Sequence, residues 1–64
     1  MSSVADAREV AYLQVIAWRY DTAVAAGLRH EDAATFAYSG IDIEALRKLA
    51  DAGCPPEVIT LILF

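Results

Sequence analysis

Three glycines, Gly27, Gly40 and Gly53, stand thirteen residues apart and are the only glycines in the chain. Each is followed four places later by a glutamate, and six, nine and ten places later by an apolar residue. Offsets six, nine and ten lie on one face of an α-helix. The spacing therefore predicts three short helices joined by tight turns; the alternative is a chance alignment. The repeated sets are Glu31, Ala33, Phe36 and Ala37; Glu44, Leu46, Leu49 and Ala50; and Glu57, Ile59, Ile62 and Leu63.

The glycines stand where helices are expected to stop. A residue just past a helix C-terminus often takes a left-handed backbone, which glycine adopts without steric cost. Such a stop places the residue after the glycine against one five positions earlier. Asp42 suits the N-cap of the second short helix, and Pro56 suits the first turn of the third. The predicted contacts are Leu28 with Ala23, Ile41 with Phe36, and Cys54 with Leu49.

The segment before Gly27 contains no helix breaker, and Ser3 with Asp6 resembles a capping box at its start. We therefore expect one long helix at about residues 4–26. The short helices are expected at about 30–38, 43–51 and 56–63. The predicted fold class is all-α, with residues 1–64 forming a single small domain built as a compact helical bundle or mini-solenoid.

The long helix carries two apolar stripes when drawn at 100° per residue. The first, predicted to cover the short helices, is Val10, Leu13, Ala17, Tyr20 and Val24, widened by Tyr12, Ile16 and Ala23. The second is Val4, Ala11, Val15 and Trp18. Gln14 and Asp21 separate the stripes on one side, and Arg8 and Arg19 on the other.

A surface helix needs only one apolar stripe, so the second predicts contact with another chain. The alternative is that the short helices wrap the long helix on both sides. If Ile59, Ile62 and Leu63 face inward, the last helix also presents apolar residues outward. The predicted interface residues are Val4, Ala11, Val15, Trp18, Leu61 and Phe64.

Composition limits the cellular compartment and the classes of partner that we expect for the protein. Hydrophobic residues make up 58% of the chain, the net charge is −4, and Cys54 is the only cysteine. A single cysteine excludes an internal disulfide, and the negative charge disfavours nucleic acid and anionic membranes. The apolar run "VITLILF" is too short to span a bilayer, and no basic segment precedes an apolar core at the N-terminus. We expect a cytoplasmic protein with no membrane partner.

Few residues suggest chemistry. His30 beside Glu31 and Asp32 could act as acid and base, but their place at a helix start favours first-turn charges. Cys54 lacks a second histidine to activate it, and its position favours a buried structural thiol. No phosphate loop, metal motif or catalytic triad is present. We therefore expect a protein that is not an enzyme and has no cofactor or metal.

A helix-turn-helix regulator is the alternative function. Ala23, Gly27 and Ala33 fit that spacing loosely, and Arg29, Arg47 and Lys48 would then contact phosphates. The helix that would enter the DNA groove carries Glu31 and Asp32, which phosphates repel. The charge of the chain also disfavours this alternative.

The steps Ala26-Gly27-Leu28 and Ala52-Gly53-Cys54, with Ser39-Gly40-Ile41 between them, resemble the short glycine-punctuated helical repeats of actinobacterial and actinobacteriophage proteins. The resemblance covers residues 15–63, and the chain lacks the repeated tryptophan of those arrays. It implies a GC-rich bacterium or its phage and assigns no activity to any residue. The favoured function is a non-catalytic protein-interaction module that forms a homodimer or larger assembly, or binds a host or cellular protein.

Overall fold

The computed structural model describes residues 4–64, and their side chains from residue 7 onward. The chain forms α1 (Val4–Ala25), α2 (His30–Tyr38), α3 (Ile43–Asp51) and α4 (Pro56–Leu63), with no strand within the described range. This confirms the all-α prediction, one long helix followed by three short ones, with bounds that agree to within a residue. The Ser3 cap and the side chain of Val4 lie outside the described residues.

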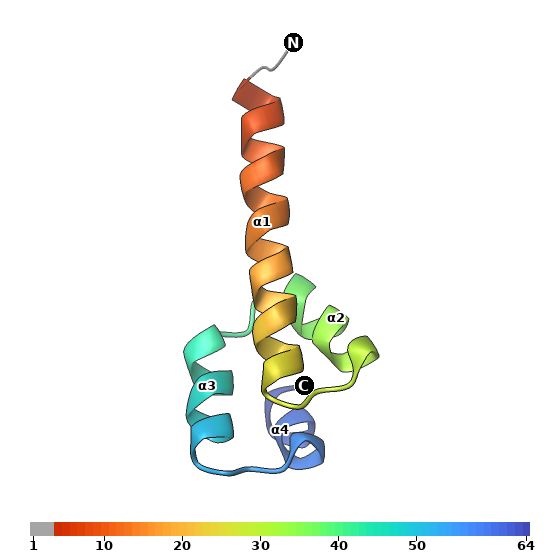
Figure 1. The fold of residues 1–64 in the computed structure, drawn as a ribbon, viewed down its shortest axis with the longest axis vertical. Helices are drawn as coiled ribbons and strands as arrows, with labels where there is room; N and C mark the ends of the chain where they lie inside the picture. Colours follow the sequence, from red (N-terminus) through yellow and green to blue (C-terminus); the bar gives the residue numbers. More distant parts are fainter. Residues whose placement is uncertain (1–3) are drawn as a thin grey trace.

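Helix α1 runs along the long axis of the molecule, and its C-terminal part packs with the three short helices (Figure 1). The N-terminal half of α1 extends beyond that bundle without a neighbouring element (Figure 1). The molecule measures 46 × 20 × 17 Å and has a radius of gyration of 13.4 Å. A compact chain of this length has a radius of gyration of about 11 Å. The difference reflects the projecting half of α1.

Two of the three glycines end helices as expected. Gly27 and Gly53 have φ angles of 97° and 82°. At the first stop, the Leu28 amide donates to the Ala23 carbonyl at 3.1 Å, and the Gly27 amide donates to Val24 at 2.9 Å. At the second stop, the Cys54 amide donates to Leu49 and the Gly53 amide to Ala50, both at 3.0 Å. This pair of bonds is the Schellman motif, which satisfies carbonyls left free at the helix end.

Gly40 ends α2 differently, and the predicted left-handed stop there is wrong. Its φ is not positive, and the C-cap is Ser39 in an extended conformation. The Ile41 amide does not donate to the Phe36 carbonyl; it donates to the Ser39 hydroxyl at 3.2 Å. The Arg19 guanidinium instead donates to the Phe36 and Ala37 carbonyls at this helix end.

The starts of the later helices follow the sequence signals. The Asp42 carboxylate accepts a hydrogen bond from the Glu44 amide at 3.0 Å, which caps α3. Pro56 begins α4, where its lack of an amide hydrogen leaves no bond unmade. Both features fix where the chain re-enters helix after a turn, so they set the directions of α3 and α4.

The core is built from equivalent positions of the three repeats. Ala33, Leu46 and Ile59, six places after their glycines, are all completely buried. Phe36 is also fully buried, and it is the largest core side chain. Ile62 was predicted to face inward with it and is instead 57% exposed. The side of α4 that carries Ile62 therefore lies at the surface of the described chain rather than in the core.

The packed face of α1 is the edge of the first predicted stripe that carries Tyr20 and Ala23, together with the neighbouring Arg19. Ala23 is fully buried, and Arg19 and Tyr20 are half-buried beside it. Val10 and Leu13, which were expected to cover the short helices, are 54% and 51% exposed. That prediction is wrong because the short helices pack mainly against the face of α1 around Tyr20 and Ala23, and only the edge of α2 approaches Leu13.

Alanine substitutions at Gly40 and Gly53, the two glycines with open surroundings, should change the free energy of unfolding in different directions. An added Cβ meets nothing within 4 Å at Gly40 or Gly53, but only Gly53 has a positive φ. We expect Gly53→Ala to destabilise by about 1–2 kcal/mol, the cost of a left-handed alanine. Gly40→Ala should be neutral or stabilise by up to about 1 kcal/mol, because the unfolded chain loses freedom. Urea unfolding measures both, and equal effects would contradict the assignment.

Candidate functional site

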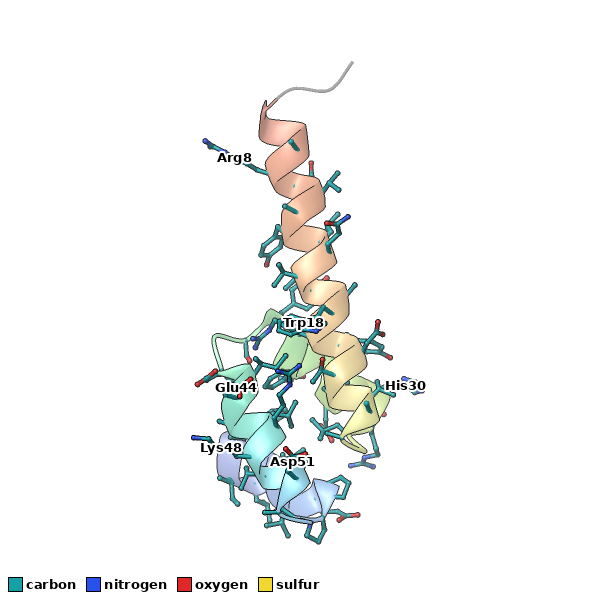
Figure 2. All side chains as sticks on the ribbon, turned by 60° about the vertical axis from the view of Figure 1, so that its left-hand side comes forward. Arg8, Trp18, His30, Glu44, Lys48 and Asp51 are labelled. Atoms are coloured by element: carbon teal, nitrogen blue, oxygen red, sulfur yellow. The ribbon has the colours of Figure 1, made fainter. Side chains whose placement is uncertain are left out.

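Residues 7–18 of α1, called here the projecting segment, form the main candidate site. From Val10 to Trp18 the sequence VAYLQVIAW contains one polar residue, Gln14. Side chains stand out on both sides of this part of the helix (Figure 2). A helix that is apolar on every side is normally buried. Here its large side chains are about half exposed: Val10 54%, Tyr12 55%, Leu13 51%, Val15 50% and Trp18 47%.

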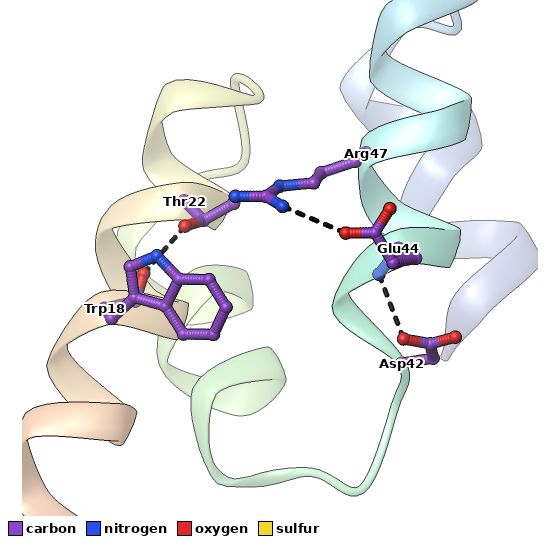
Figure 3. Close-up of polar contacts among 5 residues, drawn as sticks. All are labelled: Trp18, Thr22, Asp42, Glu44 and Arg47. Carbon is purple, nitrogen blue, oxygen red and sulfur yellow. Dashed lines mark hydrogen bonds and ion pairs between the residues drawn. The ribbon is translucent and has the colours of Figure 1, made fainter.

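One face of the projecting segment continues toward α3 and carries Ala11, Val15 and Trp18. The Arg47 guanidinium lies 5.6 Å from the centre of the Trp18 ring (Figure 3). Arg47 is held in place by an ion pair of 2.9 Å with Glu44. Trp18 is therefore partly covered within the chain, while Ala11 and Val15 above it remain exposed.

The other face ends in an apolar groove between α1 and α2. The groove has a volume of about 320 Å³. Three of its lining residues are alanines, and Asp21 is the only charged residue among them. The lining residues are Leu13, Ile16, Ala17, Tyr20, Asp21, Ala34, Ala37 and Tyr38. Sequence reasoning missed this groove, because it depends on the angle at which α2 packs against α1.

The two predicted interface residues of the C-terminus are exposed but lie elsewhere. Leu61 is 80% and Phe64 is 47% exposed. Helix α4 lies at the end of the molecule opposite the projecting segment (Figure 1). The six predicted residues therefore do not form one surface: Ala11, Val15 and Trp18 share a face, Leu61 and Phe64 belong to a second patch, and Val4 is outside the described side chains.

Arg19 was predicted to separate the two apolar stripes and instead joins α1 to the end of α2. Its Nη2 donates to the carbonyls of Phe36 and Ile41 at 2.9 and 2.7 Å, and lies 3.1 Å from the Ser39 carbonyl. Its Nε donates to Ala37 at 3.1 Å. The guanidinium also lies over the Phe36 ring at 4.4 Å. One signal could have indicated this role: Arg19 is a single arginine that follows a row of apolar residues in α1. It faces the end of α2, where no glycine takes the left-handed conformation.

The residues considered for chemistry are engaged in local contacts. The His30 Nδ1 and the Tyr20 hydroxyl share a hydrogen bond of 2.5 Å, and their rings are stacked. Asp32 pairs at 3.9 Å with Arg29 rather than with the histidine. Cys54 is half-buried and packs against the core. Among the side chains of residues 7–64, no three histidine, cysteine or acidic groups gather as metal ligands would.

The cations proposed for phosphate contact do not form a free basic surface. Arg47 is paired with Glu44, and Arg29 lies near Asp32. A second hollow beside Arg29 is bordered by two acids, Asp32 and Glu57. Nothing in this geometry favours DNA as a partner over a protein.

Comparisons with known proteins leave the chain without a match. No family model matches it, and neither a curated protein nor a solved structure does so. Among the helices described, none combines the length and apolar character needed to cross a membrane.

Proposed function

We propose that the protein is a non-catalytic protein-interaction module and that its docking element is the projecting segment of α1. A single observation carries the proposal. Nine consecutive residues with one polar member run from beyond the bundle to its edge, and Val10, Tyr12, Leu13, Val15 and Trp18 among them are about half exposed. Burial of such side chains against a partner removes apolar surface from water, at about 25 cal/mol per Å².

The shape of the module fits this role. The short helices and the C-terminal turns of α1 form their own core, with Phe36, Leu46 and Ile59 fully buried. That core anchors one end of α1 and leaves the other end free. A helix that extends beyond its own core can dock in a groove or pair with another helix. In this proposal, the surface binds either a second copy of the chain or a cellular or host protein. The proposal also places the protein in the cytoplasm and assigns it to a bacterium or its phage.

Site-specific photo-cross-linking in the expressing cell tests the proposal. A photoreactive phenylalanine analogue at Tyr12, which is 55% exposed in the projecting segment, should give a discrete protein adduct. Lys48, exposed on α3, is the control position and should give none. Leu13→Glu in the same chain should abolish the Tyr12 adduct, because it places a charge in the apolar face. Equal labelling from Tyr12 and Lys48, or an adduct that survives Leu13→Glu, would contradict the proposal.

A further inference from the structure

We infer that the partner of the projecting segment is a different protein, which docks through an amphipathic helix with basic residues at one end. The helix lies in the α1–α2 groove and places a lysine or arginine beside Asp21. The inference rests on the proposed function, since it names the kind of protein that docks there. Three features of the molecule support it: the shape of the groove, the charge at one end of the groove, and the charge of the whole chain.

The shape of the groove fits a helix. On α1 the lining residues run from Leu13 to Asp21 at positions 13, 16, 17, 20 and 21, which share one face of a helix. On α2 they are Ala34, Ala37 and Tyr38, which also share one face. Two helices that present such stripes to one groove leave the place that a third helix takes in a bundle. The α1 stripe is roughly 12 Å long, so it can contact about two turns of a docked helix.

One end of the groove is acidic. The Tyr20 ring stacks on His30, so the C-terminal end of the α1 stripe lies beside the start of α2. Asp21 lines the groove at that end, and Glu31 lies three residues before Ala34 on the same face of α2. Both carboxylates are exposed, and neither forms an ion pair within the side chains of residues 7–64. A cation of a partner can therefore pair with them.

The cations of the chain near this end are engaged elsewhere. The Arg19 guanidinium donates to carbonyls at the far end of α2, and Arg29 pairs with a carboxylate of α2. The opposite end of the groove, at Leu13 and Tyr38, has no charged lining residue. A docked helix is matched in charge when its basic residues lie at the Asp21 end and its apolar residues at the other. This asymmetry fixes the direction of the docked helix.

The charge of the chain favours a different protein over a second copy. The net charge is −4, so two copies repel each other, whereas a basic partner is attracted. The projecting segment of a second copy would bring Arg8 and Glu9 together, so it would add no net positive charge at the acidic end. The acidic end of the groove therefore favours a partner that supplies basic residues of its own.

Selection from a displayed library of helical peptides tests the inference. The probe is a library of peptides of about 15 residues, roughly four helical turns. Peptides that bind the wild-type chain should share an apolar stripe and carry lysine or arginine, rather than aspartate or glutamate, at one end of it. Fluorescence anisotropy then gives the dissociation constant of the tightest peptide. Added salt should weaken its binding, because salt screens the attraction between its basic end and Asp21.

Charge reversal at Asp21 and at Asp51 provides a matched pair of variants. Both changes alter the net charge equally, but only Asp21 lines the groove, whereas Asp51 lies on α3 (Figure 2). Asp21→Lys should raise the dissociation constant of the selected peptide at least about tenfold, because attraction becomes repulsion. Asp51→Lys should raise it less than about twofold, because the change lies outside the contact and is screened by salt.

A second pair of variants tests the groove itself. Ala34→Gln adds a bulky neutral side chain to the groove wall and should weaken peptide binding at least about tenfold, because the docked helix loses its place. Thr35→Gln is the control: Thr35 lies next to Ala34, is exposed and does not line the groove. It should bind the peptide like the wild type. Circular dichroism confirms that all four variants are folded before their affinities are compared.

The outcomes separate this inference from the proposed function. A library without binders, binders without a basic end, or equal binding by the two charge-reversal variants would overturn the inference. So would a chain that dimerises in sedimentation and loses its dimer on Ala34→Gln, since a second copy would then occupy the groove. These results leave the proposed function to the Tyr12 cross-linking test, which does not depend on Asp21. Failure of that test would overturn the proposed function, and the inference with it.

Discussion

Gly27→Ala should be the most destabilising single-methyl change in the chain, costing about 2–5 kcal/mol. Gly27 has a φ of 97°, which an alanine adopts at a cost of about 1–2 kcal/mol. Its added Cβ would also lie 2.7 Å from the Cγ of Pro56. A ring carbon has little room to move, and overpacking typically costs a further 1–3 kcal/mol. Thermal unfolding should show a loss of more than ~10 °C for a chain of this size.

Gly53→Ala is the internal control for this result. Gly53 has a similar φ of 82° but open space around its Cβ position, so the difference between the two variants isolates the clash with Pro56. Pro56→Ala in the Gly27→Ala background should recover much of that difference in a double-mutant cycle. Equal effects of the two glycine substitutions would show that Pro56 does not constrain the turn after α1.

Arg19→Met should destabilise by about 2–4 kcal/mol. The change keeps an unbranched side chain but removes the donors to the carbonyls of Phe36, Ala37, Ser39 and Ile41. Hydrogen bonds to charged groups contribute about 1.5–3 kcal/mol each and do not add fully. Arg19→Lys should recover less than half of the loss, because an ammonium lacks the planar fork and stacks poorly on Phe36. Urea unfolding gives both values.

Arg29→Met is the matched control for Arg19. The Arg29 side chain is 83% exposed, and its pair with Asp32 is long at 3.9 Å. Exposed ion pairs contribute little, so this change should shift the unfolding free energy by less than about 0.5 kcal/mol. A loss at Arg19 no larger than the loss at Arg29 would contradict the role of Arg19 as the cap of α2.

Most of the fold follows from local signals. The spacing of Gly27 and Gly53 marks two helix ends, and Asp42 and Pro56 mark two helix starts. These signals depend on residues within one or two turns, so they can be interpreted without knowledge of the tertiary structure. Gly40 matches the same pattern, yet α2 ends through Arg19, which lies about twenty residues earlier. A contact between distant residues leaves no local pattern.

The candidate site could be predicted only in part. The apolar character of Val15 and Trp18 indicated a surface that needs a partner, and both are about half exposed. Which face of α1 packs against the short helices could not be derived, because the stripe through Val10 and the face around Ala23 are both rich in apolar residues. The side occupied by α2 and α3 decides between them, and it depends on how the turns direct those helices.

Hydrogen exchange in the projecting segment tests the central claim most directly. In a monomer, residues 10–18 have only the bonds of their own helix, and a short unsupported helix end frays readily. We expect the amides of residues 10–18 to exchange much faster than the amides of α3 in the isolated chain, and to slow when a partner covers the segment. Exchange of residues 10–18 as slow as that of α3, in a dilute sample of the isolated chain, would contradict a segment that is left free to dock against a partner.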